Sequence, residues 1–417
     1  MATRLPKRDF VVYVLTPSFP PTAGGQESHL LELSASLIAA GTPVLVITRR
    51  TARAVPAREC LGTVPVRRLR PYGAIKGVGF RAVPRLGILL CKMIWRLLRD
   101  RHRYDVVLVS GFNFMPFAPV LAGMLTGKPC VVRPESPLEV TEPVGSGSRE
   151  KMGLSESSIA LRLLRSVRRF AARRVDRYVA ISSEIRAGLE RFGIDSGRIV
   201  AIPNGIAIER FAPVSAAAKA RLRTLLALPV DRLLLIYTGR LALSKGVMML
   251  IDVWRELAPS HPEGHLIILG TGQGCFDDCE PAMHDFIAAH ALGSRVTVAG
   301  SVPNVHEYLQ ASDMFVFPSD YEGFSLSILE AMTAALPIVS TRVGIAAELD
   351  HTCRFGLLVP PRDRAGFRDA IQRLLPDADL RAELGANARA AVLAQYSVTQ
   401  EARRYIEVFE ELAESAS

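Results

Sequence analysis

The sequence predicts two doubly wound α/β domains in one chain of 417 residues. Three observations support this fold class: a strand–loop–helix–strand pattern heads each half, the strands are continuously apolar, and the length suffices for two ordinary domains. Continuous apolar strands are typical of parallel sheets that are covered by helices on both faces. The composition, with 49% hydrophobic and 22% charged residues, is that of a globular protein.

The first pattern begins with the strand-like run "FVVYVLTP" at Phe10–Pro17. It continues through the loop "SFPPTAGG" into a helical pattern over Gln26–Ala40, which Gly41 ends, and a second strand follows at Pro43–Thr48. This order predicts a βαβ unit.

The second pattern repeats that order. A strand at Leu233–Gly239 leads through the loop "RLALSKG" to a helix over about Val247–Leu257 and a strand at His265–Gly270. Further apolar runs predict strands at Tyr104–Ser110, Pro129–Arg133, Arg177–Ser182, Arg198–Pro203, Arg295–Gly300, Asp313–Ser319 and Pro337–Thr341. We place the junction of the two domains near Pro203–Pro213, giving domains at 1–208 and 209–399. Ligands bind outside the carboxyl ends of strands in such sheets, so two facing sheets place the site in the cleft between them.

The stretch "DYEGFSLSILEAM" follows a predicted strand and carries Glu322 and Glu330. Ser327 and Glu330 have the spacing of a capping box, which predicts a helix start near Ser327, with Glu322 in the loop and Glu330 in the first turn. Carboxylates at a helix N-terminus, where backbone N–H groups favour phosphate, suit a ligand with hydroxyls and phosphate such as a nucleotide-sugar. The alternative is a plain capping residue and a solvated loop carboxylate.

Arg240 and Lys245 lie five residues apart in the loop "RLALSKG" of the same predicted sheet. A planar guanidinium and a compact ammonium together neutralise a diphosphate without a metal. The alternative is two ordinary surface charges.

The sequence offers little for a metal and nothing for a membrane span. No DxD pair follows a strand, and Cys275 and Cys279 have no second Cys or His pair at zinc spacing. No run approaches the roughly 18 apolar residues that a spanning helix needs, and the N-terminus lacks a signal-peptide pattern. We therefore expect no metal cofactor and a cytoplasmic location.

Charge is distributed unequally between the two halves. Residues 1–210 hold 33 Lys and Arg against 16 Asp and Glu, a net +17, whereas residues 211–417 hold 18 against 25, a net −7. The segments Arg81–Arg103 and Leu161–Arg174 mix arginine with Leu, Ile, Trp and Phe at near-helical spacing. Such helices suit an anionic membrane surface, although ordinary amphipathic helices packed on the sheet fit as well. No nucleic-acid-binding motif accompanies the basic residues, so we expect no nucleic acid partner.

In the order and spacing of its motifs, the chain resembles the retaining glycosyltransferases of family 4, which have the GT-B fold: two Rossmann-like domains that face each other across a cleft. The similarity rests on "FPPTAGGQESHLLELSASLIAAGTPVLVIT", "VAISSEIRAGL", "IPNGI", "TGRLALSKG", "DMFVFPSDYEGFSLSILEAM" and "FGLLVPPRD". It implies an N-terminal acceptor-side domain, a C-terminal nucleotide-sugar domain, and a C-terminal helix at about 400–417 that packs back on the first domain.

The resemblance also implies roles for single residues. Arg240 and Lys245 would hold the donor diphosphate and stabilise the leaving group, and Glu322 would contact the transferred sugar. Glu330 would meet the ribose hydroxyls. Further donor contacts would come from the backbone N–H groups of Phe324, Ser325 and Leu326 and from the close backbone approach that Gly24 and Gly25 allow.

Several positions depart from the family pattern. Ser325 stands where many members have glycine, and the loop "SGFNFMPFAP" lacks a histidine that members often carry. Asn113, Arg133 and Glu135 are therefore candidates to touch a sugar, while Arg133 and Glu135 equally suit an exposed ion pair with each other. His29 lies inside a helical pattern, which favours a structural role.

These features predict metal-independent, retaining transfer of a hexose-type sugar from a UDP-, GDP- or ADP-linked donor. The acceptor would be a glycan or lipid-linked hydroxyl in polysaccharide, lipid-linked oligosaccharide or glycolipid biosynthesis, with the protein peripheral on the inner face of the cell membrane. A nucleotide-sugar epimerase and a catalytically silent nucleotide-sugar-binding protein are the alternatives, and transfer to an added acceptor separates all three.

Overall fold

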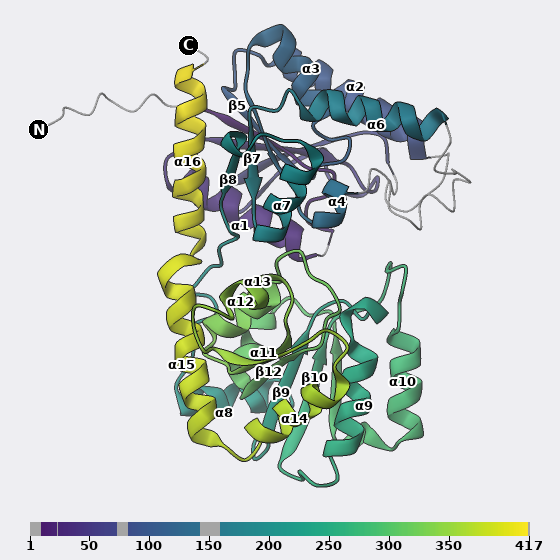
Figure 1. Cartoon of the computed structure of the whole chain (residues 1–417), viewed down its shortest axis with the longest axis vertical. Coiled ribbons are helices and arrows are strands. Elements are labelled where there is room, and N and C mark those ends of the chain that lie inside the picture. Colours follow the sequence, from purple (N-terminus) through teal and green to yellow (C-terminus); the bar gives the residue numbers. More distant parts are fainter. Residues whose placement is uncertain (1–9, 23, 73–81, 142–158, 416–417) are drawn as a thin grey trace, which may run out of the picture. The chain divides into compact units, whose positions relative to one another are not determined.

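The computed structural model describes residues 10–22, 24–72, 82–141 and 159–415 (Figure 1). The chain divides into two compact units, one comprising Met1–Gly205 and Val398–Ser417 and the other Ile206–Ser397. The basic residues at the start of the chain, Arg81 and the last two residues belong to the first unit's sequence but lie outside the described residues. Each unit is a sheet covered by helices.

The described residues of unit 1 form an eight-stranded sheet in the order β3-β4-β2-β1-β5-β6-β7-β8. Its strands are β1 (Val12–Leu15), β2 (Val44–Arg49), β3 (Arg58–Leu61), β4 (Val64–Leu69), β5 (Val106–Ser110), β6 (Cys130–Arg133), β7 (Arg177–Ala180) and β8 (Ile199–Ala201). Neighbouring strands run parallel, except that β3 and β4 form an antiparallel hairpin. β1 and β5 are buried along their whole length, as expected for central strands covered on both faces.

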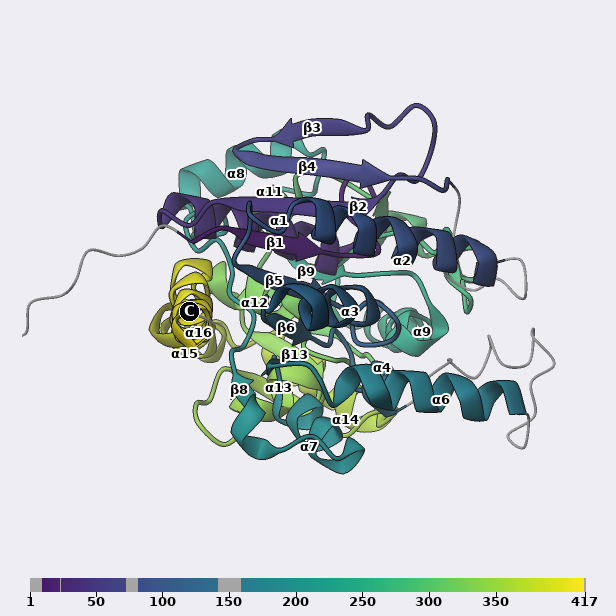
Figure 2. The same ribbon diagram turned by 90° about the horizontal axis from the view of Figure 1, so that it is seen from above.

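Helices cover both faces of this sheet. They are α1 (Gly25–Ala39), α2 (Ala82–Arg99), α3 (Phe117–Thr126), α4 (Pro137–Thr141), α6 (Ile159–Ala172), α7 (Ser183–Phe192) and α16 (Val398–Ser415). α2, α3 and α6 lie side by side with α3 in the middle (Figure 2). α1 and α16 pack against each other on the opposite face. α1 lies there because the chain moves from β1 to β2 in one direction along the sheet, whereas it moves from β5 to β6 in the other direction.

Unit 2 has a six-stranded sheet among the described residues, in the order β11-β10-β9-β12-β13-β14, with all neighbouring strands parallel. The strands are β9 (Leu233–Thr238), β10 (Gly264–Leu269), β11 (Val296–Gly300), β12 (Met314–Phe317), β13 (Ile338–Thr341) and β14 (Gly356–Val359). The helices are α8 (Ala216–Leu225), α9 (Val247–Leu257), α10 (Glu280–Ala289), α11 (Val305–Ala311), α12 (Leu326–Thr333), α13 (Gly344–Leu349), α14 (Arg364–Leu374) and α15 (Ala378–Gln395).

In each sheet the strand order reverses at one pair of central strands. The pair is β1 and β5 in unit 1, and β9 and β12 in unit 2. Loops that leave the carboxyl ends of such a pair turn to opposite faces and leave a crevice, where doubly wound folds bind ligands. The loop after β9 carries Arg240 and Lys245, and the loop after β12 carries Glu322.

The structure confirms the predicted fold class of two doubly wound parallel sheets. It adds three strands that the sequence analysis did not predict: the β3–β4 hairpin at one edge of the first sheet and β14 at one edge of the second. The hairpin strands alternate buried or half-buried positions with more exposed ones and carry arginines, so they lack a continuous apolar run, and β14 has only four residues.

Candidate active site in unit 2

The loop after β9 is folded tightly against the end of β12. Gly246 has φ +69°, and a Cβ atom there would lie 2.0 Å from the carbonyl oxygen of Pro318. Only glycine fits this combination of a left-handed backbone and a close approach. The backbone N–H of Asp320 also donates to the carbonyl of Ser244 at 3.0 Å, so the two loops hold each other in place.

Lys245 and Glu322 meet across these two loops. The Nζ of Lys245 donates to Oε1 of Glu322 at 2.6 Å, and the two side chains are 13% and 12% exposed. The structure thus brings together two of the predicted site residues, from loops separated by 77 positions in sequence. A largely desolvated ammonium–carboxylate pair is held in one geometry and still reaches solvent, so it can exchange partners with a polar ligand.

Arg240 lies at the other end of the β9 loop with an exposed side chain. Its backbone carbonyl accepts a 2.9 Å hydrogen bond from the hydroxyl of Tyr237, a buried residue of β9. Burial raises the pKa of Tyr237, the charge of Glu322 raises it further, and the charge of Arg240 lowers it. Arg240 and Glu322 therefore lie within electrostatic reach of the same hydroxyl, and Tyr237 stays a neutral donor that fixes the Arg240 backbone.

The start of α12 differs from the sequence prediction. The helix begins at Leu326 with Ser325 as its N-cap residue, and no side chain caps it. The predicted capping box of Ser327 and Glu330 is wrong, because Ser327 is already the second helical residue. Glu330 is the fifth helical residue and lies in the second turn rather than the first; it is half-buried.

Ser325 adopts the left-handed backbone conformation that glycine favours, with φ 76° and ψ 74°. Its hydroxyl is buried and makes no hydrogen bond to the described residues. Gly344 presses against this residue, since a Cβ at Gly344 would lie 2.8 Å from the Ser325 Oγ. An unusual backbone and an unpartnered hydroxyl thus coincide at the N-terminus of α12.

The remaining predicted contacts of unit 2 cluster around the same N-terminus. Phe324 is buried, and its carbonyl accepts a 2.8 Å hydrogen bond from the N–H of Ile345. Leu326, the first helical residue, is half-buried. The first N–H groups of a helix have no intrahelical partner and favour anions, so this end of α12 can receive a phosphate.

Gly24 and Gly25 lie at the start of α1, beyond the carboxyl end of β1. Gly24 is extended, with φ 166°, so its backbone does not require glycine. A Cβ there would instead lie 2.1 Å from Oε2 of Glu27, a buried carboxylate in the first turn of α1 that the sequence analysis did not single out. The loop after β5 contributes Asn113, whose buried Oδ1 accepts no hydrogen bond from the described residues.

Arg133 and Glu135 pair with each other, with Nη1 of the arginine 3.2 Å from Oε1 of the glutamate. The sequence analysis offered a sugar contact or an ion pair for these residues, and the structure shows the ion pair. The pair is buried rather than exposed, which corrects the expectation of a surface contact. Arg133 also donates to Asn204 Oδ1 at 2.7 Å. Burial lowers the pKa of Arg133, but the charges of surrounding acidic groups, led by Glu135, raise it above its usual value.

His29 belongs to the same buried network. Its Nδ1 accepts from Arg133 at 3.1 Å, which leaves a proton on Nε2 to donate to Glu401 of α16 at 2.8 Å. Glu401 also accepts from the N–H of Gly205 at 2.8 Å. Both ring nitrogens of His29 are occupied by protein, in agreement with the structural role that the sequence analysis favoured.

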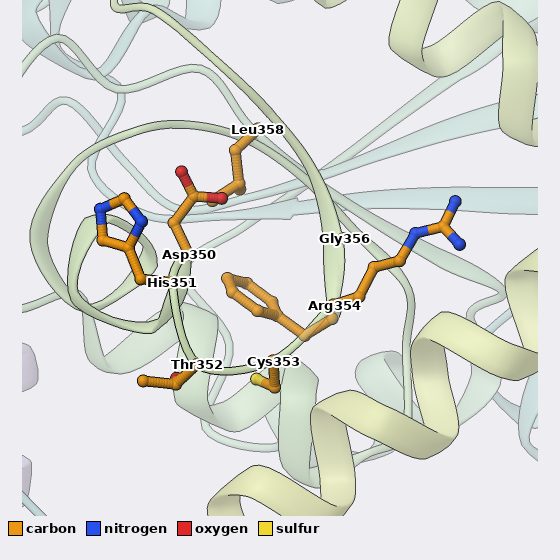
Figure 3. A pocket seen from close by; sticks show the side chains of 8 residues that line it. Asp350, His351, Thr352, Cys353, Arg354, Gly356 and Leu358 are labelled. Carbon is orange, nitrogen blue, oxygen red and sulfur yellow. The ribbon is translucent and has the colours of Figure 1, made fainter.

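A separate hollow in unit 2 surrounds the loop between α13 and β14 and has a volume of about 340 Å³. Figure 3 shows His351 and Arg354 on opposite sides of it. Asp350 accepts a 2.6 Å hydrogen bond from Arg342, and burial raises the pKa of the Cys353 thiol. None of the predicted site residues lines this hollow.

In unit 1, α2 carries apolar side chains on two faces. Leu89, Met93 and Leu97 are buried against the unit, while Ile88 and Trp95 are 48% and 58% exposed. α6 likewise exposes Leu163. The helices therefore pack on the unit and also present apolar groups to solvent. No helix of the described residues is long and apolar enough to cross a membrane.

Two family models match this chain. Residues 23–210 match the model described as Glycosyltransferase Family 4, and residues 232–377 match that described as Glycosyl transferases group 1. The chain belongs to the glycosyltransferases of family 4. It is therefore an enzyme of the glycosyltransferase class. This confirms the resemblance to family 4 that the sequence motifs indicated.

A curated relative is similar to most of this chain in sequence, and two solved structures are similar to nearly all of it in fold. The D-inositol 3-phosphate glycosyltransferase of Xylanimonas cellulosilytica is 29% identical over 397 residues, which are 88% of this chain and 87% of the relative. Sucrose-phosphate synthase from Thermosynechococcus elongatus has a TM-score of 0.77 at 24% identity and covers 98% of this chain and 100% of its own. Anabaena HepE in complex with UDP-glucose has a TM-score of 0.74 at 20% identity, covering 96% and 100%. These structures establish the GT-B fold.

Proposed function

We propose that this family 4 glycosyltransferase uses the loops after β9 and β12 as its nucleotide-sugar site. The observation that carries the proposal is the Lys245–Glu322 pair, 2.6 Å apart at the carboxyl ends of adjacent strands where the strand order reverses. A cation for phosphate and a carboxylate for sugar hydroxyls lie together beside a helix N-terminus, which is the set of groups that a nucleotide-sugar requires.

Arg240 and Lys245 would hold the diphosphate and meet the negative charge that develops on it as it leaves. Glu322 would turn from Lys245 to the hydroxyls of the transferred sugar. The N–H groups of Phe324, Ser325 and Leu326 would contact sugar and phosphate, with Glu330 at the ribose. For unit 1, Gly24 and Gly25 stay the proposed backbone contacts to the donor, on the strength of the family resemblance.

The proposed reaction retains the configuration of the sugar. The bond from the anomeric carbon to the diphosphate oxygen breaks, and a bond to the acceptor oxygen forms on the same face. The proton of the acceptor hydroxyl passes to the departing phosphate oxygen, so that atoms and charge balance without a further reactant. We propose that two cationic side chains and a helix N-terminus serve in place of a metal. Among the described residues no group of three or more His, Cys, Asp or Glu side chains is arranged to hold one.

The proposal also covers the donor and the acceptor. HepE binds UDP-glucose, which favours a UDP-linked hexose for the first trial, with GDP- and ADP-linked hexoses beside it. The exposed apolar and basic side chains of α2 and α6 support a lipid-linked acceptor and a peripheral position on the inner face of the cell membrane. Polysaccharide, lipid-linked oligosaccharide and glycolipid synthesis are the pathway classes that fit such an acceptor.

The test is sugar transfer from each radiolabelled donor to a panel of glycan and lipid-linked acceptors, in the presence of EDTA. Retaining transfer that survives EDTA supports the proposal, and NMR of the product's anomeric proton reports its configuration. Conversion of the donor sugar without an acceptor would instead indicate an epimerase. Binding of donor with no turnover would indicate a binding protein.

A further inference from the structure

Unit 1 has a concave pocket of about 360 Å³ that no proposed donor contact uses. Five arginines line it: Arg58, Arg67, Arg96, Arg99 and Arg103. The sole carboxylate in the lining is that of Asp100, so five positive charges face one negative charge, a net of +4. A concave surface with this excess of charge is an electrostatic well for a compact anion.

The arginines come from the β3–β4 hairpin and from the end of α2 with the segment that follows it. Arg58 of β3 and Arg67 of β4 are directly opposed in the antiparallel hairpin. Like charges opposed in this way destabilise a strand pair unless something lies between them. Arg96 and Arg99 come from the last turn of α2, and Arg103 follows it in the segment that leads into the amino end of β5.

Arg96 shows that the charge is built into the fold rather than merely solvated. It is 7% exposed, and its Nε has no hydrogen-bond partner among the described residues. It forms an ion pair with Asp100, whose Oδ2 also accepts from the hydroxyl of Tyr13 at 3.1 Å. Asp100 is thus committed to holding Arg96 in place, and it leaves the other four guanidinium groups without a carboxylate in the pocket.

Two of the other arginines, Arg67 and Arg99, face the pocket without an ion pair to its carboxylate. The guanidinium carbon of Arg99 lies 5.1 Å from the ring centroid of Trp95, which also lines the pocket. Burial lowers the pKa of Arg67, and the charges of Arg96 and Arg58 lower it further. An anion between these side chains would relieve the repulsion and supply the acceptor atoms that the pocket lacks.

We infer that this pocket is a binding site for a phosphoryl group, either of a small soluble phosphate ester or of a lipid headgroup. Phosphate oxygens match the fork of a guanidinium, and several arginines converge here on a space that holds one compact anion. The end of α2 that lines the pocket lies near the amino end of β5, whereas Gly24 lies beyond the carboxyl end of β1. The pocket is therefore separate from the proposed donor contacts of unit 1.

The first experiment measures the thermal midpoint of the full chain with inorganic pyrophosphate, at constant ionic strength and with EDTA. All variants carry Arg240→Ala to weaken pyrophosphate binding at the proposed donor site. We expect pyrophosphate to raise the midpoint of the Arg240→Ala protein by at least ~2 °C. The control variant, Arg85→Gln/Lys92→Gln, loses two exposed charges of α2 outside the pocket and should show the same rise. Arg67→Gln/Arg99→Gln should abolish the rise. A rise that survives in that variant, or no rise in the Arg240→Ala background, would overturn the inference.

A folding defect in the pocket variant would be recognised independently. Removing two charges from this arginine cluster, one of them repelled by Arg58 and Arg96, should raise, not lower, the ligand-free midpoint of Arg67→Gln/Arg99→Gln at low salt. A lower ligand-free midpoint would contradict the repulsion on which the site is argued.

A second experiment distinguishes the two sources of the phosphoryl group. Sedimentation with vesicles of phosphatidylcholine containing phosphatidic acid is compared with sedimentation with phosphatidylcholine alone. A larger loss of binding in Arg67→Gln/Arg99→Gln than in the control of equal charge, Arg85→Gln/Lys92→Gln, would identify a lipid headgroup. If the pocket variant and the control lose vesicle binding equally, and the pyrophosphate rise still depends on the pocket, the ligand is a soluble phosphate ester. Equal losses of vesicle binding without a pocket-dependent pyrophosphate rise would overturn the inference.

Discussion

The two units place charged side chains at the carboxyl ends of their central strands in opposite ways. In unit 2, Lys245 pairs with Glu322 while both still reach solvent, and Arg240 is exposed. In unit 1, Arg133 and Glu135 are buried and pair with each other, and both ring nitrogens of His29 are occupied by protein groups. The same fold has thus produced one site open to a ligand and one site closed on itself. The comparison predicts that Arg240, Lys245 and Glu322 of unit 2 govern activity, whereas the Arg133–Glu135 pair of unit 1 governs stability.

The largest expected effect is that of breaking the buried network of unit 1. Arg133→Leu should lower the free energy of unfolding by about 3–5 kcal/mol, because it leaves Glu135 buried without its charged partner. Urea denaturation measures this change. Arg186, whose pair with Glu190 is exposed, is the matched control, and Arg186→Leu should cost no more than ~0.5 kcal/mol. Similar losses in the two variants would mean that the network does not hold unit 1 together.

Lys245→Ala should lower kcat about 10²–10³-fold, the usual cost of removing one group that stabilises developing charge. Steady-state transfer from the donor that is active in the transfer assay measures it. Lys219 pairs with Asp313 at 2.6 Å in the same unit, away from the β9 and β12 loops, so Lys219→Ala should leave kcat nearly unchanged. Equal rates for the two variants would remove Lys245 from the site.

Gly246→Ala tests whether the two loops of unit 2 must touch. Its positive φ and the approach to Pro318 predict a loss of about 1–3 kcal/mol in stability and weaker donor binding. Gly293→Ala adds a Cβ into open space and should change stability by less than ~0.5 kcal/mol. Chemical denaturation compares the pair, and an unperturbed Gly246→Ala would show that the loops tolerate separation.

The smallest expected effect concerns Ser325. Ser325→Gly should stabilise the protein by up to ~1 kcal/mol, because glycine adopts this left-handed conformation without strain. Ser327→Gly, inside the same helix, should destabilise it by about 0.5–1 kcal/mol. If Ser325→Gly destabilises the protein as much as Ser327→Gly does, then the Ser325 hydroxyl stabilises the fold by more than the strain of the left-handed backbone destabilises it. A change of donor KM in Ser325→Gly would further indicate that the hydroxyl meets the ligand.

The sequence was sufficient for the parallel sheets and for the position of the unit 2 loops. Continuous apolar strands identify central strands, and the carboxyl end of each strand fixes where Arg240, Lys245 and Glu322 emerge. It was not sufficient for the start of α12, where a left-handed Ser325 lies close to Gly344, a tertiary contact that local spacing does not encode. The capping box follows a common local pattern that the structure does not adopt.

The unit 1 network shows the same limit over a longer range. His29 meets Glu401 across 372 positions of sequence, so no local pattern predicts that the ring is occupied. The arginine pocket could not be predicted from the sequence either, because the hairpin that supplies Arg58 and Arg67 lacks the apolar run of a central strand. Sequence predicted the basic character of this unit but not the convergence of its charges.

The most direct test of the central claim is calorimetric titration of UDP, GDP and ADP into the protein in the presence of EDTA, repeated with Arg240→Ala. We predict that one of the three diphosphates binds without a divalent metal and that Arg240→Ala weakens this binding at least ~10-fold, as expected for the loss of a charge-assisted contact of about 1.5–3 kcal/mol. Binding that requires a metal, or that Arg240→Ala leaves unchanged, would contradict the proposal that the loops of unit 2 hold the donor diphosphate.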